Sequence, residues 1–185
     1  MRKSILDFLK GESPPSGVSA HTREKGCLTE EMNSSVGKRL SDAPAIEGRL
    51  HIDHIRGDSV IATFETPNYI VDAGLAEVAA LISTSGGGTK FSAIAVGTNS
   101  AATATNQTAL SGESHRVVFA DAVAANTATF TATFSFTGSF TVQEAGIFNH
   151  TTTAGDMLSR RIFSAVNVAS GDTLVITWSI TVNRT

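Results

Sequence analysis

The chain has 185 residues, of which 41% are hydrophobic and 17% are charged, with a formal net charge of −3 at pH 7. This size and hydrophobic content suffice for one domain with a core of its own. The small negative charge argues against the basic surface that nucleic-acid binding requires, the single cysteine rules out an internal disulfide, and no apolar stretch is long enough to span a membrane. We therefore expect neither nucleic acid nor a membrane as a partner.

The first part of the chain is predicted to be an extended N-terminal arm over residues 1–48, followed by a domain over residues 49–185. The arm holds three of the four prolines and a single aromatic residue, Phe8, and it is much richer in charge than the domain. Such a segment cannot bury enough apolar surface to fold by itself. We therefore expect the arm to become ordered on another chain.

Residues 1–10 supply the candidate partner-binding residues of the arm. Ile5, Phe8 and Leu9 fall on one helical face at three-and-four spacing, but so short a helix is not stable in isolation. A docking helix and a frayed terminus are therefore both open, while charged residues interrupt the stretch too early for a signal peptide. The residues predicted to bind the partner are Arg2, Lys3, Ile5, Phe8 and Leu9, with the two basic residues facing an acidic patch.

A hairpin follows the arm, with strands over residues 50–56 and 60–64 on either side of Gly57-Asp58-Ser59. Glycine and aspartate favour tight turns between strands. The tripeptide Arg56-Gly57-Asp58, which some cell-surface receptors bind, is for that reason interpreted as part of a turn.

One helix is predicted over residues 73–83, after Asp72 as the capping residue and before the glycines at 86–88. The glycines are interpreted as a flexible connector, because they lack the lysine and hydroxyl residue of a phosphate-binding loop. The helix face expected to pack on the core consists of Leu75, Val78, Ala79 and Ile82.

Strand patterns fill the rest of the domain. Residues 127–137 alternate apolar and hydroxyl side chains, and residues 173–182 do so with Val175 as the exception. This alternation is typical of half-buried strands. Several such strands joined by short turns favour a mainly β fold, an antiparallel β-sandwich of jelly-roll-like type with one short helix. Further strands are predicted over residues 91–97, 115–123, 139–143, 145–149 and 157–166, and the predicted core residues are Phe130, Phe134, Phe136, Leu174, Ile176, Trp178 and Ile180, beside Ile94 and Val96.

The sequence contains no recognisable catalytic or metal-binding set. His51 and Asp53 share one face of a strand and could reach one ion, but no third ligand is placed by sequence, and polar residues on the solvent side of a strand are commoner. Ser114 and His115 are adjacent, so on a regular strand they point to opposite faces and cannot act as nucleophile and base. Glu144 lacks a carboxylate partner for acid–base work, so a turn or a subunit contact is expected there. We expect no enzymatic activity and no cofactor.

Three blocks of the domain, residues 48–82, 91–113 and 142–182, resemble a recurrent module of structural proteins from tailed bacteriophages. In that module a strand and an asparagine-containing turn lead to a helix. An IAVGTG-like strand follows, here AIAVGTN, with Asn99 where the pattern often has glycine. A loop ending in TAL…E, an EAGIF turn and a final LTITW-like strand complete the module, here TALSGE, EAGIF and LVITW. The resemblance to this module does not extend to the N-terminal arm.

The resemblance implies a β-sandwich protein of a virion, assembled in the host cytoplasm, but it does not fix the location in the particle. We expect a non-enzymatic capsid decoration or cement protein that stabilises the head shell through its arm and through self-association. Its expected partners are copies of itself, as a homotrimer, and the major capsid protein or other virion proteins. A neck or tail-fibre subunit and a receptor- or carbohydrate-binding module are the alternatives.

Overall fold

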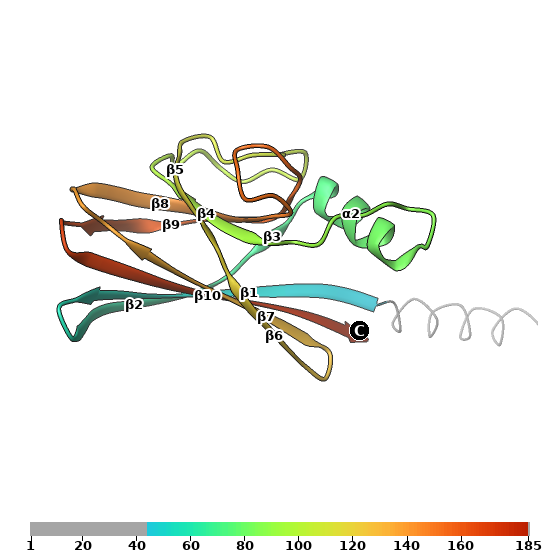
Figure 1. Cartoon of the computed structure of the whole chain (residues 1–185), viewed down its shortest axis with the longest axis horizontal. Helices are drawn as coiled ribbons and strands as arrows, with labels where there is room; N and C mark the ends of the chain where they lie inside the picture. Colours follow the sequence, from blue (N-terminus) through green and yellow to red (C-terminus); the bar gives the residue numbers. More distant parts are fainter. Residues whose placement is uncertain (1–43, 185) are drawn as a thin grey trace, which may run out of the picture. The chain divides into compact units, whose positions relative to one another are not determined.

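Ten strands and one helix make up residues 44–184, the part of the chain that the computed structural model describes (Figure 1). Sheet A has the strand order β2-β1-β10-β7-β6, and sheet B has the order β3-β9-β8-β4-β5. All pairs are antiparallel, so the predicted mainly β antiparallel sandwich with one short helix is confirmed. The elements are β1 (Pro44–Arg56), β2 (Ser59–Pro67), β3 (Tyr69–Ile70), α2 (Asp72–Ile82), β4 (Ala93–Gly97), β5 (Glu113–Val118), β6 (Ala120–Ala124), β7 (Thr127–Ser135), β8 (Phe140–Phe148), β9 (Met157–Val168) and β10 (Asp172–Arg184).

The first strand begins earlier than the predicted domain boundary. Residues 44–48, which the composition placed in the arm, pair with the end of β10 and belong to sheet A. The turn between β1 and β2 is formed as predicted, with Gly57 at a φ of +58°, a conformation that favours glycine. The predicted partner-binding residues Arg2, Lys3, Ile5, Phe8 and Leu9 lie outside the described residues.

Two strand predictions need correction. The segment predicted as one strand over residues 115–123 is divided between β5 and β6, which belong to different sheets. The chain crosses between the sheets at Phe119, whose side chain is buried in the core. Conversely, the segments predicted at 139–143 and 145–149 form the single strand β8. The EAGIF sequence is therefore the last part of a strand rather than a turn.

The core lies between the two sheets and is formed by one parity of the alternating strands. Trp178 on β10 is fully buried, and Phe134 on β7 is 1% exposed. Phe130 is the exception, since it is only partly buried beside β6, a strand whose residues are all exposed. The other predicted core residues are buried, namely Phe136, Leu174, Ile176 and Ile180, together with Ile94 and Val96.

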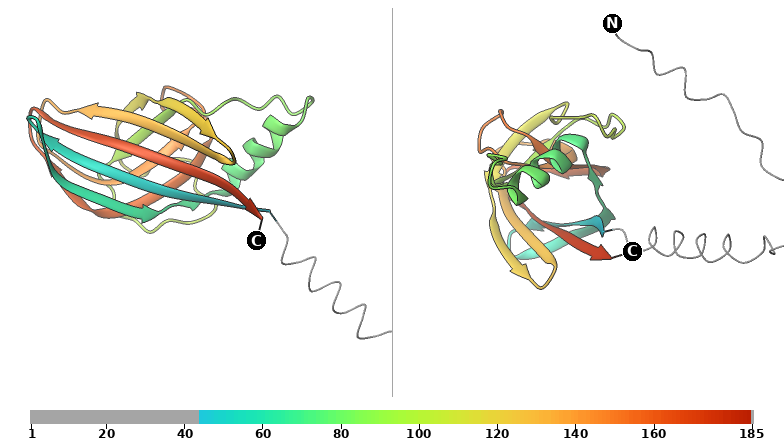
Figure 2. Two further views of the ribbon diagram at one scale, coloured as in Figure 1. Left: turned by 90° about the horizontal axis from the view of Figure 1, so that it is seen from below. Right: turned by 90° about the vertical axis from the view of Figure 1, so that its right-hand side faces the viewer.

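The opposite parity of β7 and β10 forms a hydroxyl-rich outer face of sheet A, whose strands lie side by side in Figure 2. Thr127 faces Thr181 across the two strands, with 3.0 Å between their hydroxyl oxygens. Thr129 pairs with Ser179 and Thr131 pairs with Thr177. β-branched threonine fits this pleated surface well. The face therefore has a structural reason for its composition.

The helix α2 differs from its predicted orientation. Val71 takes the N-cap position without a side-chain cap, and Asp72 is the first helical residue. Gly74 is the buried contact of the helix, because a Cβ atom there would overlap the backbone of Leu158 on β9. Of the four residues predicted to face the core only Val78 packs against it. Leu75, Ala79 and Ile82 are exposed.

Candidate functional site

The outer face of sheet B carries a fully buried ion pair. Nε and Nη2 of Arg160 on β9 donate to Oε2 of Glu144 on β8, at 3.0 and 2.7 Å, and neither side chain is exposed. The expectation that Glu144 lies in a turn or a subunit contact is thus wrong. The sequence reasoning missed Arg160. Two adjacent arginines within a predicted strand were the available signal, because alternation places one on each face and a buried charge needs a partner.

This ion pair attaches the long loop over residues 98–112 to the sheet. The backbone N–H of Gly112 donates to Oε1 of Glu144 at 2.8 Å. Nη1 of Arg160 donates to the side-chain oxygen of Gln107 at 2.8 Å and to the carbonyl of Ala101 at 3.2 Å. Each charged group therefore has several hydrogen-bond partners, which is the condition under which a buried pair is tolerated. The pair acts as a clamp for the loop.

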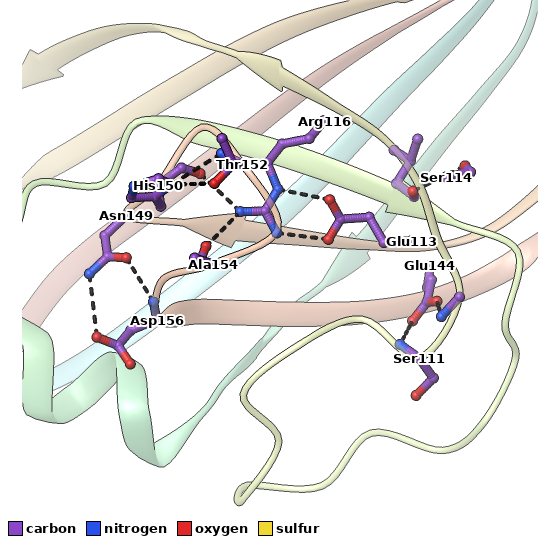
Figure 3. A network of polar contacts seen from close by, with 12 residues as sticks. Ser111, Glu113, Ser114, Arg116, Glu144, Asn149, His150, Thr152, Ala154 and Asp156 are labelled. Carbon is purple, nitrogen blue, oxygen red and sulfur yellow. Dashed lines mark hydrogen bonds and ion pairs between the residues drawn. The ribbon is translucent and has the colours of Figure 1, made fainter.

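A second clamp holds the loop over residues 149–156 (Figure 3). Arg116 donates to both carboxylate oxygens of Glu113, at 2.8 and 2.7 Å, and its Nη1 donates to the carbonyls of His150 and Ala154. Its guanidinium lies 3.9 Å from the ring centroid of Phe148, a favourable cation–π geometry. The charged groups drawn in Figure 3 thus fix loops and are committed to internal contacts.

Ser114 and His115 are closer than predicted, with 3.1 Å between the serine oxygen and Nδ1 of the histidine. The pairing of β4 with β5 shifts between Val96 and Gly97, which leaves Ser114 as an extra, bulged residue. A bulge redirects side chains, so the strict alternation behind the prediction fails here. The serine hydroxyl donates to the carbonyl of Val96. In this arrangement the hydroxyl proton of Ser114 is directed at the Val96 carbonyl.

His51 and Asp53 contact each other on the outer face of sheet A, with 3.1 Å between Nε2 and Oδ2. The other ring nitrogen of His51 contacts Glu65 at 3.1 Å. This hydrogen bond to Glu65 is the main cause of a raised pKa of His51, while the hydroxyl of Thr63 lowers the pKa of Asp53. Both histidine nitrogens are occupied by carboxylates. Among residues 44–184 no cluster of three or more histidine, cysteine or acidic residues could hold a metal ion.

Another polar group joins β1 to the β9–β10 turn. Nε2 of His54 donates to Oδ2 of the buried Asp172 at 2.8 Å. Arg56 donates to both oxygens of that carboxylate, at 2.8 and 2.7 Å. The hydrogen bonds from Arg56, then those from the Ala169 backbone and His54, hold the pKa of Asp172 well below its usual range. Arg56 is thus occupied within the fold, in agreement with its interpretation as part of a turn.

The helix α2 leaves apolar side chains on the surface. On α2, Leu75 is 46% exposed and Ile82 is 81% exposed, and Glu77 is engaged by Asn149. None of the helices within residues 44–184 is long and apolar enough to cross a membrane. Comparisons of the chain with known protein families, with curated proteins and with solved structures find no match.

Proposed function

We propose that this chain is a non-enzymatic structural protein of a bacteriophage particle, a capsid decoration protein that stabilises the head shell through its N-terminal arm and through self-association. The proposal rests on the observation that buried ionisable side chains bind other groups within the domain. Glu144, Arg160, Arg116 and Asp172 all hold strands and loops together. A domain of this kind is suited to serve as a rigid part of an assembly.

The exposed face of α2 also supports an assembly role. A helix that is apolar on nearly all sides is normally covered by protein, and exposed apolar patches mark interaction surfaces. Leu75, Ala79 and Ile82 form such a face. The part of the sheet A outer face that β7 and β10 form offers a second surface, on which hydroxyl side chains predominate. The assignment to a virion, made in the host cytoplasm, comes from the resemblance of residues 48–182 to phage structural modules.

Quantitative mass spectrometry of purified particles from host cells that make this chain tests the proposal. A copy number comparable to that of the major capsid protein is expected for a decoration protein. A few copies per particle would instead indicate a neck or tail-fibre subunit, and absence from the particles would refute the virion role.

The arm is tested separately by deleting residues 1–40. Because β1 begins at Pro44 and the core is built from the residues after it, the deletion should leave the melting of the domain nearly unchanged. Incorporation into particles should be lost. Full incorporation of the shortened chain would show that the arm is not the anchor.

A further inference from the structure

Arg161 on β9 is a half-buried arginine whose guanidinium has an unpartnered nitrogen. Its Nε atom is buried and has no hydrogen-bond partner. None of the ion pairs within residues 44–184 includes this side chain. Nearly all buried polar atoms in folded proteins have a partner, and an exception calls for an explanation such as a bound ion. Arg161 is therefore a candidate for binding a group from outside the domain.

The ion pairs of three other arginines show which partner fits this geometry. In each of them Nε and Nη2 donate together to one carboxylate, over distances between 2.7 and 3.0 Å. The pairs are Arg56 with Asp172, Arg116 with Glu113, and Arg160 with Glu144. The planar fork of N–H donors matches a carboxylate, and it also fits a phosphate. The Nε of Arg161 thus lacks the oxyanion that the other three have.

Arg161 lines a cleft of about 570 Å³ between residues 63–66 of β2 and residues 161–164 of β9. The two strands belong to different layers (Figure 1). β2 is the edge strand of sheet A, and β3 covers β9 only at Ser159 and Arg160. The cleft therefore lies on an open side of the sandwich. Its volume is within the range of about 300–1,000 Å³ that is usual for sites of small molecules.

The walls of the cleft place apolar surface beside this charge. Phe64 of β2 and Phe163 of β9 both line the cleft, and both are only partly buried against the core. The acidic residue of the cleft, Glu65, contacts His51 on the outer face of sheet A and makes no ion pair with Arg161. A ligand that fits the cleft therefore has an anionic group on an apolar body.

We propose that the cleft binds a small organic acid. The carboxylate of the ligand accepts hydrogen bonds from Nε and one Nη of Arg161, and its apolar body contacts Phe64 and Phe163. A carboxylate fits better than a phosphate, because Arg161 is the only cationic residue among those that line the cleft. One guanidinium balances the single charge of a carboxylate, whereas a phosphate group carries about −1.5 to −2 at pH 7. Such a site combines an apolar wall with one polar group that fixes the orientation of the ligand.

Isothermal titration calorimetry with the isolated full chain tests the site, with phenylacetate as the probe. Saturable one-to-one binding of phenylacetate is expected. Phenylacetamide is the matched neutral ligand, because it has the same ring without the charge, and it should bind at least about tenfold more weakly. Inorganic phosphate should also bind more weakly, since it lacks an apolar body. Binding of phosphate without binding of phenylacetate would overturn the assignment to an organic acid. Because the measurement involves no particle, its failure would leave the proposed virion role standing.

Variants of Arg161 test whether this residue binds the ligand. Arg161→Gln should weaken the binding of phenylacetate at least about tenfold. Arg161→Lys should restore only part of the affinity, because lysine keeps the charge but lacks the planar fork. Arg49→Gln is the matched control, because Arg49 is exposed and does not line the cleft. If Arg161→Gln fails to fold, the comparison of phenylacetate with phenylacetamide in the wild type still decides. No binding of phenylacetate, equal binding of the two ligands, or equal binding by the wild type and a folded Arg161→Gln variant would overturn the inference.

Discussion

Replacing Glu144 by glutamine should destabilise the domain by about 3–5 kcal/mol, the usual cost of removing one partner from a buried ion pair. The carboxylate accepts two hydrogen bonds from Arg160 and one from the backbone of Gly112, and it has no exposed surface. Glutamine has one acceptor oxygen, so its NH₂ group must face a donor on one side. Either the guanidinium or the loop over residues 98–112 then loses its acceptor.

The loss of stability in the Glu144→Gln variant can be measured by urea unfolding. The fluorescence of the single tryptophan, Trp178, reports on it, because this residue is fully buried. For a domain of this size the same free energy corresponds to a fall in melting temperature of about 10–15 °C. Glu47→Gln is the matched control, because Glu47 is exposed and its substitution should change stability by less than about 0.5 kcal/mol.

The combined variant Glu144→Leu with Arg160→Met distinguishes ion pairing from packing. Replacing both partners by apolar residues leaves no uncompensated charge, so much of the lost stability should return. The loop over residues 98–112 should nevertheless become more sensitive to proteolysis in both variants, because its hydrogen bonds to the pair are gone. A loss below about 1 kcal/mol for Glu144→Gln would refute the clamp role.

Three further predictions concern other parts of the fold. Phe134→Ala should cost about 3–5 kcal/mol by urea unfolding, because Phe134 is buried in the core; a cost near zero would mean that the wrong parity faces inward. Gly74→Ala should lower the melting temperature although alanine favours helices by about 1 kcal/mol, because the new Cβ overlaps the Leu158 backbone and such overpacking costs about 1–3 kcal/mol. The depressed pKa of Asp172, caused chiefly by Arg56, gives stability that is present above about pH 4, the ordinary aspartate value, and is lost as the pH falls toward the folded value. In the Asp172→Asn variant, the unfolding midpoint measured from pH 2 to 7 should fall less steeply in acid than in the wild type. The same fall in both proteins would contradict this prediction.

The core could be predicted from the sequence because strand geometry imposes a period of two on exposure. Phe134 and Trp178 were assigned correctly from alternation alone. The helix was a different case. Its apolar residues surround the axis, so the periodicity did not identify the buried side. The buried side is set by the close approach of Gly74 to Leu158, a tertiary contact without a local signal.

The polar groups were less predictable because their positions depend on register between distant strands. Sequence shows neither the bulge that brings Ser114 beside His115 nor the pairing that brings Arg160 to Glu144. At Ser114 a single extra residue on β5 changes which side chains share a face. Irregularities of this kind are decided by the packing of both sheets at once.

Arg160 and Arg161 show how strand geometry gives neighbouring residues of the same type different roles. Arg160 points to the outer face of sheet B, where Glu144 and the loop over residues 98–112 satisfy its guanidinium. Arg161 points to the cleft, where its Nε has no partner among the described residues. Strand alternation therefore commits Arg160 to the folded chain and leaves Arg161 at the cleft.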